Sequence, residues 1–298
     1  MSKKIPSITL ALLIGTVLIT NQNALCAMEA EPAIDETTTG TQSRTRLLAE
    51  IEALSKMAPD AMFVSRATNI LDLAGHIEGA AGGELTRQVK DAITPGVRTL
   101  AEALAVREPD AMFVSRATNI LDLAGHIEGA AGGELKTQVR NAITPGVQIL
   151  VEALALAARE PDPVMFVSKA TGLWNLTTSM EGAGGELKTQ LRNAITPGVQ
   201  ILAEAFAARK PDPVMFVSQA TGLWNLTTSM EGAGGELKTQ VRNAITPGVQ
   251  ILAEAFAARA SDPLFVSQAT SLLDLASLIE GPGGGPLTSR INTIIATH

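Results

Sequence analysis

The chain has 298 residues, of which 46% are hydrophobic and 18% charged, and its formal net charge at pH 7 is -7. This length and hydrophobic content suffice for one or two buried cores, so the composition excludes wholesale disorder. The acidic balance disfavours nucleic acid, whose phosphates bind clustered lysines and arginines, and it gives no general attraction to an anionic membrane. Only 3% of the residues are aromatic, which also argues against base-stacking platforms.

Residues 1–27 have the layout of a secretory signal peptide. Lys3 and Lys4 precede an apolar stretch over about 8–19, and small residues follow at 24–27. The apolar stretch is well short of the roughly 20 residues that a membrane-spanning helix needs. We therefore expect export to the periplasm, the cell surface or the medium, with no stable membrane span after cleavage. An uncleaved anchor is the alternative.

The residues around the expected cleavage junction limit the thiol chemistry that is available to the processed chain. Cys26 is the single cysteine, and the Asn23-Ala24-Leu25 that precedes it does not fit the pattern of a lipid-modified cysteine, so lipidation is the alternative here. With at most one thiol, the processed chain forms no internal disulfide and depends on packing alone. Residues 28–45 are acidic and Thr-rich without an apolar period, and they are expected to form a disordered tether.

The remainder of the chain is a tandem repeat. Residues 59–85 are identical to 109–135, and residues 161–209 match 211–259 at all but two positions. Five phenylalanines open equivalent segments at spacings of 50, 53, 50 and 49 residues: Phe63, Phe113, Phe166, Phe216 and Phe265. Self-similarity at such a period is typical of solenoids and other repeat arrays.

Each unit is expected to contain three helices. The first starts at an N-cap such as Asp60 and ends at a glycine such as Gly79, with an apolar face of Phe63, Ala67, Ile70, Ala74 and Ile77. In later copies Pro163, Pro213 or Pro263 stands at its first position.

The second and third helices are separated in this interpretation by a Thr-Pro-Gly sequence. The second buries Leu187, Leu191, Ala194 and Ile195, and the third lines up Val199, Leu202, Ala203 and Phe206. Pro197 biases Thr196 away from helical angles, which predicts a break there. A continuous, kinked helix is the alternative.

These helices predict an all-α fold without β-sheet: a right-handed α-solenoid of five three-helix units of about 50 residues. The predicted units, which make up a repeat domain over 46–298, lie near 46–95, 96–145, 146–197, 198–247 and 248–298. The array resembles armadillo and HEAT repeats in architecture only, since neither family's diagnostic motif is present. A closed helical bundle is the alternative.

The stretch "EGAGGELKTQ" at 181–190 suggests a phosphate loop at first sight. A phosphate-binding loop needs Gly-x-x-x-x-Gly-Lys-[Ser/Thr], or Gly-x-Gly-x-x-Gly between a strand and a helix. Here Glu186 and Leu187 separate Gly185 from Lys188, and no strand is predicted before the loop. The glycines are therefore interpreted as a turn between helices, and no cofactor is expected.

Asp72 and His76 lie four residues apart and share one helical face, as a metal-binding pair would. A metal site normally needs three or four ligands, and the equivalent residues of the third unit are Asn175 and Ser179. No metal is therefore expected. If these variable positions line one groove in the structure, a binding face is indicated.

A second group of candidate partner-binding residues consists of tryptophans and basic side chains. Trp174 and Trp224 occupy a position held by leucine in the other units, which favours core or inter-repeat packing over a binding hot spot. Met165 and Met180 are interpreted in the same way. Lysine and arginine pairs on the second helices would form a short basic ladder: Lys136 with Arg140, Lys188 with Arg192 and Lys238 with Arg242. Glu102, Glu152, Glu204 and Glu254 would form an acidic ladder on the third helices.

No catalytic constellation is apparent. The recurring serine, first seen at Ser65, has no histidine in its own unit in three of the five copies. We therefore expect a non-enzymatic exported protein that acts as an interaction or scaffold module for an unknown protein partner. The alternative is a structural or lipid-binding protein built from amphipathic helices.

Overall fold

In the computed structural model, the described residues fold into α-helices. The chain divides into two compact units, residues 1–43 and 44–298. The predicted signal peptide and Cys26 lie outside the described residues. The structure describes residues 36–79, 83–129, 132–181, 185–208, 212–232, 234–258 and 265–297, and all regular secondary structure in them is helical.

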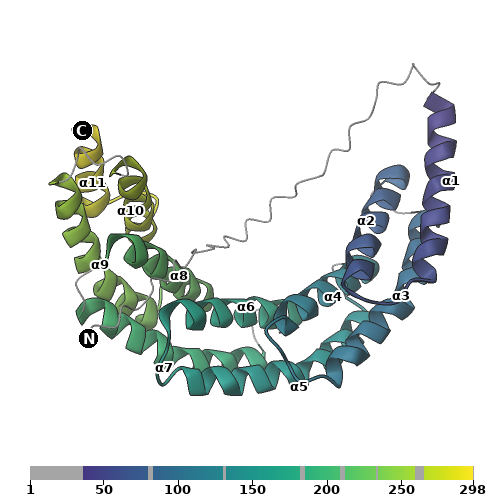
Figure 1. Ribbon diagram of the computed structural model, residues 1–298, viewed down its shortest axis with the longest axis horizontal. Coiled ribbons are helices and arrows are strands. Elements are labelled where there is room, and N and C mark those ends of the chain that lie inside the picture. The colour runs from purple at the N-terminus through teal and green to yellow at the C-terminus, as the bar shows by residue number, and fades with distance from the viewer. Residues whose placement is uncertain are drawn as a thin grey trace, which may run out of the picture. The chain divides into compact units, whose positions relative to one another are not determined.

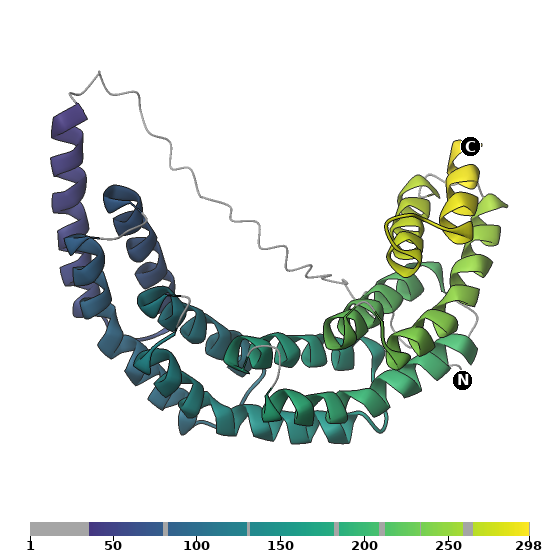
Figure 2. The same ribbon diagram turned by 180° about the vertical axis from the view of Figure 1, so that it is seen from behind.

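Residues 44–298 form two layers of helices. Each even-numbered helix packs against the next even-numbered one, and from α3 onward each odd-numbered helix packs against the next odd-numbered one (Figure 1). The even layer comprises α2 (Ala61–Glu78), α4 (Phe113–Glu128), α6 (Pro163–Glu181), α8 (Pro213–Glu231) and α10 (Phe265–Glu280). The odd layer comprises α3 (Glu84–Ala105), α5 (Glu134–Ala157), α7 (Glu186–Ala208), α9 (Glu236–Ala257) and α11 (Pro286–Ala296), and Figure 2 shows both layers from behind.

The repeating unit is a helix pair, because each even helix also packs against the odd helix that follows it. This stacking of pairs confirms the expected all-helical repeat solenoid. The prediction of three helices in each unit is wrong, since α3, α5, α7 and α9 run unbroken through their prolines. The predicted unit boundaries near 96, 146, 198 and 248 therefore fall inside continuous helices.

The proline fails to break the helix because it lies on the solvent side. Pro197 is exposed in α7, and the carbonyl that loses its partner belongs to Asn193, an exposed residue that water can solvate. The Thr196 hydroxyl donates a hydrogen bond of 2.8 Å to the Arg192 carbonyl one turn earlier. The burial of the apolar face on both sides of the proline then outweighs the local backbone penalty.

The ends of the even helices follow the sequence signals. Asp60 is the N-cap of α2, and its carboxylate accepts a hydrogen bond of 2.9 Å from the Phe63 amide. α6 and α8 begin at Pro163 and Pro213, as predicted. Gly79 ends α2 with φ of 84°, a left-handed angle that glycine adopts at low cost. Pro263 lies outside the described residues.

The core lies between the two layers and is lined by the predicted apolar faces. The first-helix positions Phe63, Ala67, Ile70 and Ala74 are buried, as are Leu187, Leu191, Ala194, Ile195, Val199, Leu202 and Ala203 of α7. Phe206 is half-buried. Ile77 is the exception, because 39% of it is exposed.

The predicted tether is partly helical. α1 spans Glu36–Ser55, so the expectation of disorder over 28–45 is wrong from Glu36 onward, and residues 28–35 lie outside the described residues. Leu47, Ile51 and Leu54 are buried on one face of α1 and hold its second half against the array. Once that half is helical, adding further turns at its start costs little, because helix propagation is easier than nucleation.

Candidate binding face

One exposed column of the even helices differs in charge and polarity between repeats. In each even helix, the positions equivalent to Asp72 and His76 are exposed: Asp122, Asn175, Asn225 and Asp274, and His126, Ser179, Ser229 and Leu278. We call these ten residues the variable face. The exchanges at core positions of these helices involve no charged residue: Leu121 corresponds to Trp174 and Ala124 to Thr177, and all four are buried.

The histidines of the variable face have a defined tautomer. His76 Nδ1 lies 2.8 Å from the Asp72 carbonyl oxygen, and His126 Nδ1 lies 2.9 Å from that of Asp122. A carbonyl only accepts hydrogen bonds, so Nδ1 must be the donor in both rings. In the neutral ring Nε2 is then the acceptor, and both imidazoles offer that atom at the surface.

Two shallow hollows connect the variable face from one pair to the next. The first, of about 400 Å³, is lined by Asp72, His76 and Lys90 together with His126 of the following pair. The second, of about 480 Å³, is lined by His126 and Lys136 together with Ser179. His126 therefore belongs to both hollows, and the predicted site residues Asp72 and His76 lie on a surface that continues from α2 to α6.

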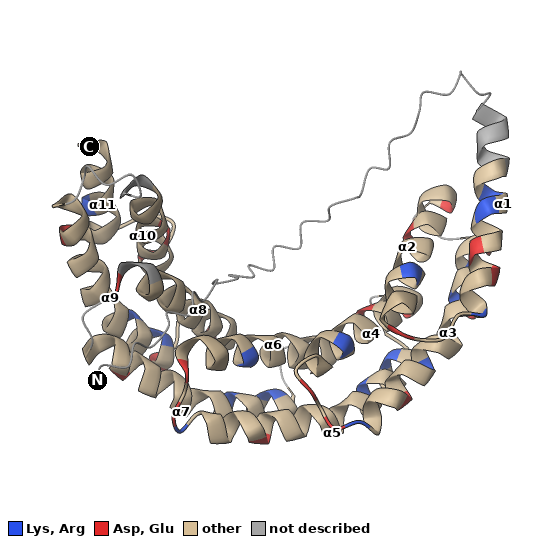
Figure 3. Cartoon of the chain, viewed as in Figure 1, with Lys and Arg blue, Asp and Glu red and all other residues tan. Residues whose placement is uncertain are grey.

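Each hollow combines hydrogen-bond acceptors with the ammonium group of a lysine, which is a donor. Among the described residues, no group of three His, Cys, Asp or Glu side chains is placed to hold a metal ion. Acidic and basic residues are interspersed along both layers of helices (Figure 3).

The predicted tryptophan sites lie inside the array. Trp174 and Trp224 are each only 3% exposed. Trp174 Nε1 donates a hydrogen bond of 3.1 Å to the Ser229 carbonyl of α8, so this ring joins two repeats. Neither indole is therefore available as a surface hot spot.

Two of the three pairs of the predicted basic ladder are engaged within the protein. Lys188 Nζ lies 4.9 Å from the ring centre of Trp174, and Arg192 donates a hydrogen bond to the Met230 carbonyl. In the next repeat Lys238 Nζ lies 4.8 Å and the Arg242 guanidinium carbon 5.6 Å from the Trp224 ring centre. Such cation–π contacts favour packing of the basic side chains against the indoles.

The glutamates of the predicted acidic ladder are exposed, whereas one of the two methionines is buried and the other is exposed. Glu102, Glu152, Glu204 and Glu254 are exposed, as expected for a solvated helix face. Met180 is buried, but Met165 is 56% exposed, so the packing role expected for Met165 is wrong. Met165 precedes the first apolar core position of α6, Phe166, and therefore points away from the core.

A glutamate in each glycine loop has a role that the sequence did not suggest. The Glu78 carboxylate accepts hydrogen bonds of 2.8 Å and 2.9 Å from the amides of Leu85 and Thr86, the first turn of α3. The same contact recurs in all five loops, through Glu128, Glu181, Glu231 and Glu280. The helix start that resembled a phosphate site therefore already binds a carboxylate of the chain.

These hydrogen bonds shift the acidity of the carboxyl groups. The amide of Thr86, followed by that of Leu85, holds the pKa of Glu78 below its ordinary value against the opposing effect of desolvation. Burial alone would raise the pKa of Glu280, but hydrogen bonds from the amides of Thr288 and Leu287 outweigh it, and the pKa is lowered. Recurrence of the glutamate in every loop was the signal for this role.

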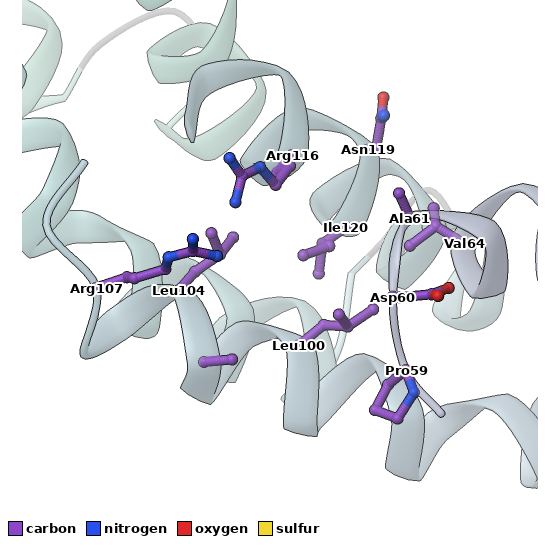
Figure 4. A pocket seen from close by; sticks show the side chains of 11 residues that line it. Pro59, Asp60, Ala61, Val64, Leu100, Leu104, Arg107, Arg116, Asn119 and Ile120 are labelled. Atoms are coloured by element: carbon purple, nitrogen blue, oxygen red, sulfur yellow. The ribbon is translucent and has the colours of Figure 1, made fainter. Parts of the chain in front are cut away.

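An apolar groove of about 390 Å³ lies between the start of α2, the end of α3 and α4 (Figure 4). Leu100 and Leu104 of α3 and Ile120 of α4 line it, and Arg107 and Arg116 lie at one end. Arg116 donates a hydrogen bond of 2.6 Å to the Asp110 carboxylate and holds the pKa of that group below its usual range. A groove of about 400 Å³ recurs one repeat earlier between α1 and α2, lined in part by Arg66, Asn69 and Ile70.

Comparison with known proteins adds little to these observations. No family model matches the chain, and no curated protein matches it. No helix of the described residues is long and apolar enough to cross a membrane. One solved structure is similar, a "circular tandem repeat protein with novel repeat topology and enhanced subunit contact surfaces", at 14% identity and a TM-score of 0.31. The match covers 88% of this chain and 60% of that one, and it assigns neither a family nor a function.

Proposed function

We propose that this chain is an exported, non-enzymatic protein whose helical array binds a protein partner through the variable face. The observation that carries the proposal is that residues of the variable face, which differ between repeats, line two surface hollows. The first two repeats carry Asp and His at one exposed column, where the third and fourth carry Asn and Ser. These positions are exposed in every repeat, which suits a surface role.

A polypeptide is the partner that suits this surface. Successive helix pairs present the column at regular intervals, and repeat arrays of this kind offer extended surfaces on which a chain can lie across several units. The carboxylates, amides and imidazole acceptors supply hydrogen bonds, and the face carries no cluster of positive charges. This chemistry fits an ordinary polar protein surface better than a polyanion.

The binding role is tested by comparing two surface variants. Asp122→Ala/His126→Ala changes the centre of the variable face, whereas Gln148→Ala/Glu152→Ala changes exposed residues of α5 in the odd layer. Both proteins are used as bait against envelope fractions and host lysates. A discrete protein retained by the wild type and the α5 variant but lost from the face variant supports the proposal. Equal retention by both variants, or no retained protein, contradicts it.

Export is a separate part of the proposal and has its own test. It is supported by the basic start, the short apolar stretch and the small residues of residues 1–27. Cell fractionation should place the chain outside the cytoplasm, and mass spectrometry should find a new N-terminus near residue 28. A cytoplasmic protein that retains Met1 would contradict export while leaving the binding role open.

A further inference from the structure

Identical residues differ in burial between the first helix pair and the second. Leu73 is 46% exposed and Ile77 is 39% exposed, whereas their copies Leu123 and Ile127 are 1% and 8% exposed. Residues 59–85 and 109–135 have the same sequence, so the difference comes entirely from the surroundings. The apolar face that is covered in α4 is therefore open in α2.

The residues of this face point toward the preceding helix pair. A β-carbon on Gly172 of α6 would lie 3.5 Å from Val114 of α4, and one on Gly222 of α8 would lie 3.3 Å from Val167 of α6. Asn69 is the equivalent position of α2. We call Asn69, Leu73 and Ile77 the N-terminal end face.

The position equivalent to Leu73 is deeply buried in every later even helix. From α4 to α10 its equivalents are no more than 1% exposed: Leu123, Leu176, Leu226 and Leu275. Each is covered by the even helix of the preceding pair, which α2 lacks among the described residues. α1 packs along the odd side of α2, where it lines a hollow with Arg66 and Ile70, and it leaves Leu73 exposed.

The opposite end of the array is apolar as well. Trp174 of α6 points toward the following pair, as its bond to Ser229 shows, and Leu273 is its equivalent in α10. Leu273 is only partly buried. Leu278 is 44% exposed at a position where the four earlier repeats carry His or Ser. We call Leu273 and Leu278 the C-terminal end face.

We infer that the N-terminal end face of one copy docks on the C-terminal end face of a second copy, continuing the array from chain to chain. The contact is the one already made four times between successive even helices, now formed between α10 of one chain and α2 of the next. Exposed apolar surface of this kind is a favoured site of association. Because the two faces differ, the contact is head-to-tail, and it generates rings or open chains rather than a symmetric dimer.

The test uses two variants that each damage one end. Leu73→Gln/Ile77→Gln changes the N-terminal end face, and Leu278→Gln changes the C-terminal one. Met112→Gln/Leu156→Gln is the matched control, since Met112 and Leu156 are exposed apolar residues away from both ends. Circular dichroism first establishes that each purified chain is folded, and mass spectrometry establishes its N-terminus.

Sedimentation velocity over a wide concentration range then gives the assembly state. The wild type and the control should self-associate, and each end variant should raise the dissociation constant at least about tenfold, from the apolar area that it leaves uncovered. A mixture of the two end variants should form a one-to-one dimer, because each supplies the end that the other lacks. A monomeric wild type would overturn the inference. So would a Leu278→Gln chain that associates as well as the wild type.

Discussion

Phe63 of α2 lies so close to Gly96 of α3 that a β-carbon at position 96 would overlap the aromatic ring. Phe63 is 2% exposed, so the ring cannot swing out to solvent without losing its burial. The same contact recurs in the next three repeats: Phe113 with Gly146, Phe166 with Gly198 and Phe216 with Gly248. The glycine of each Thr-Pro-Gly sequence is therefore a packing site for the first aromatic residue of the preceding helix.

Substitution of this glycine should destabilise the array. Gly96→Ala inserts a methyl group into a close-packed contact, and we expect it to lower the free energy of unfolding by about 1–3 kcal/mol. Gly75→Ala is the matched control, because Gly75 lies in α2 with nothing within 4 Å of its added β-carbon. There alanine should stabilise by up to about 1 kcal/mol through its higher helix propensity. Denaturant unfolding of both variants measures the two effects, and a stabilising Gly96→Ala would contradict the contact.

The proline of the Thr-Pro-Gly sequence should be dispensable for the helix, and Pro197 of α7 tests this. Pro197→Ala gives back the amide that can bond to the Asn193 carbonyl, and we expect the free energy of unfolding to rise, by at most about 3 kcal/mol. Denaturant unfolding checks the change. A marked loss of stability would mean that the bend made by Pro197 is needed to fit α7 against its neighbours.

The capping glutamates should make stability depend on acid pH. The folded-state pKa of Glu78 is below its ordinary value of 4.5. Its contribution is therefore fully present above pH 4.5 and is lost as the pH falls through the folded pKa. Glu78→Gln should lower the thermal midpoint at neutral pH and have a smaller effect in strong acid.

The control for this prediction is Glu102→Gln, which changes an exposed glutamate of α3, the helix that Glu78 caps, and should leave the midpoint nearly unchanged. A Glu78→Gln effect of equal size at neutral and at strongly acid pH would contradict a role for the carboxylate charge.

Deletion of residues 198–247 should leave a folded, shorter array. The cut joins Pro197 to Gly248 and restores an unbroken Thr-Pro-Gly helix made from the first half of α7 and the second half of α9. Because each pair contacts only its neighbours, the deletion removes one repeat and one interface. Circular dichroism should show a cooperative melt with less helix. Loss of that melt would indicate a closed bundle instead.

Local signals predicted the parts of the fold that depend on neighbouring residues in the chain. Asp60 as a cap, Gly79 as a stop and the period of Phe63, Ala67 and Ile70 are all properties of a single segment. The helix through Pro197 could not be predicted in this way, because the burial of Leu191 and Val199 on either side of the proline decides it. That burial is supplied by other helices.

The candidate site shows the same division. The difference between Asp72 and Asn175 in the sequence indicated which positions vary, but their arrangement on one surface required the stacking of pairs. The role of Glu78 was missed, although its recurrence in every loop was visible. The difference in burial between Leu73 and Leu123 could not be predicted from the sequence. The two residues lie in identical segments, and only the stacking of helix pairs covers one and not the other.

The most direct test of the binding role is site-specific photo-crosslinking in the native host. A photoreactive residue is placed at Asp122 on the variable face or at Gln148 on α5, both of which are exposed. We expect a crosslinked species of one defined mass from position 122 and none from position 148. Identical products from both positions, or no product from Asp122 and its equivalents Asp72 and Asn175, would contradict a binding role for the variable face.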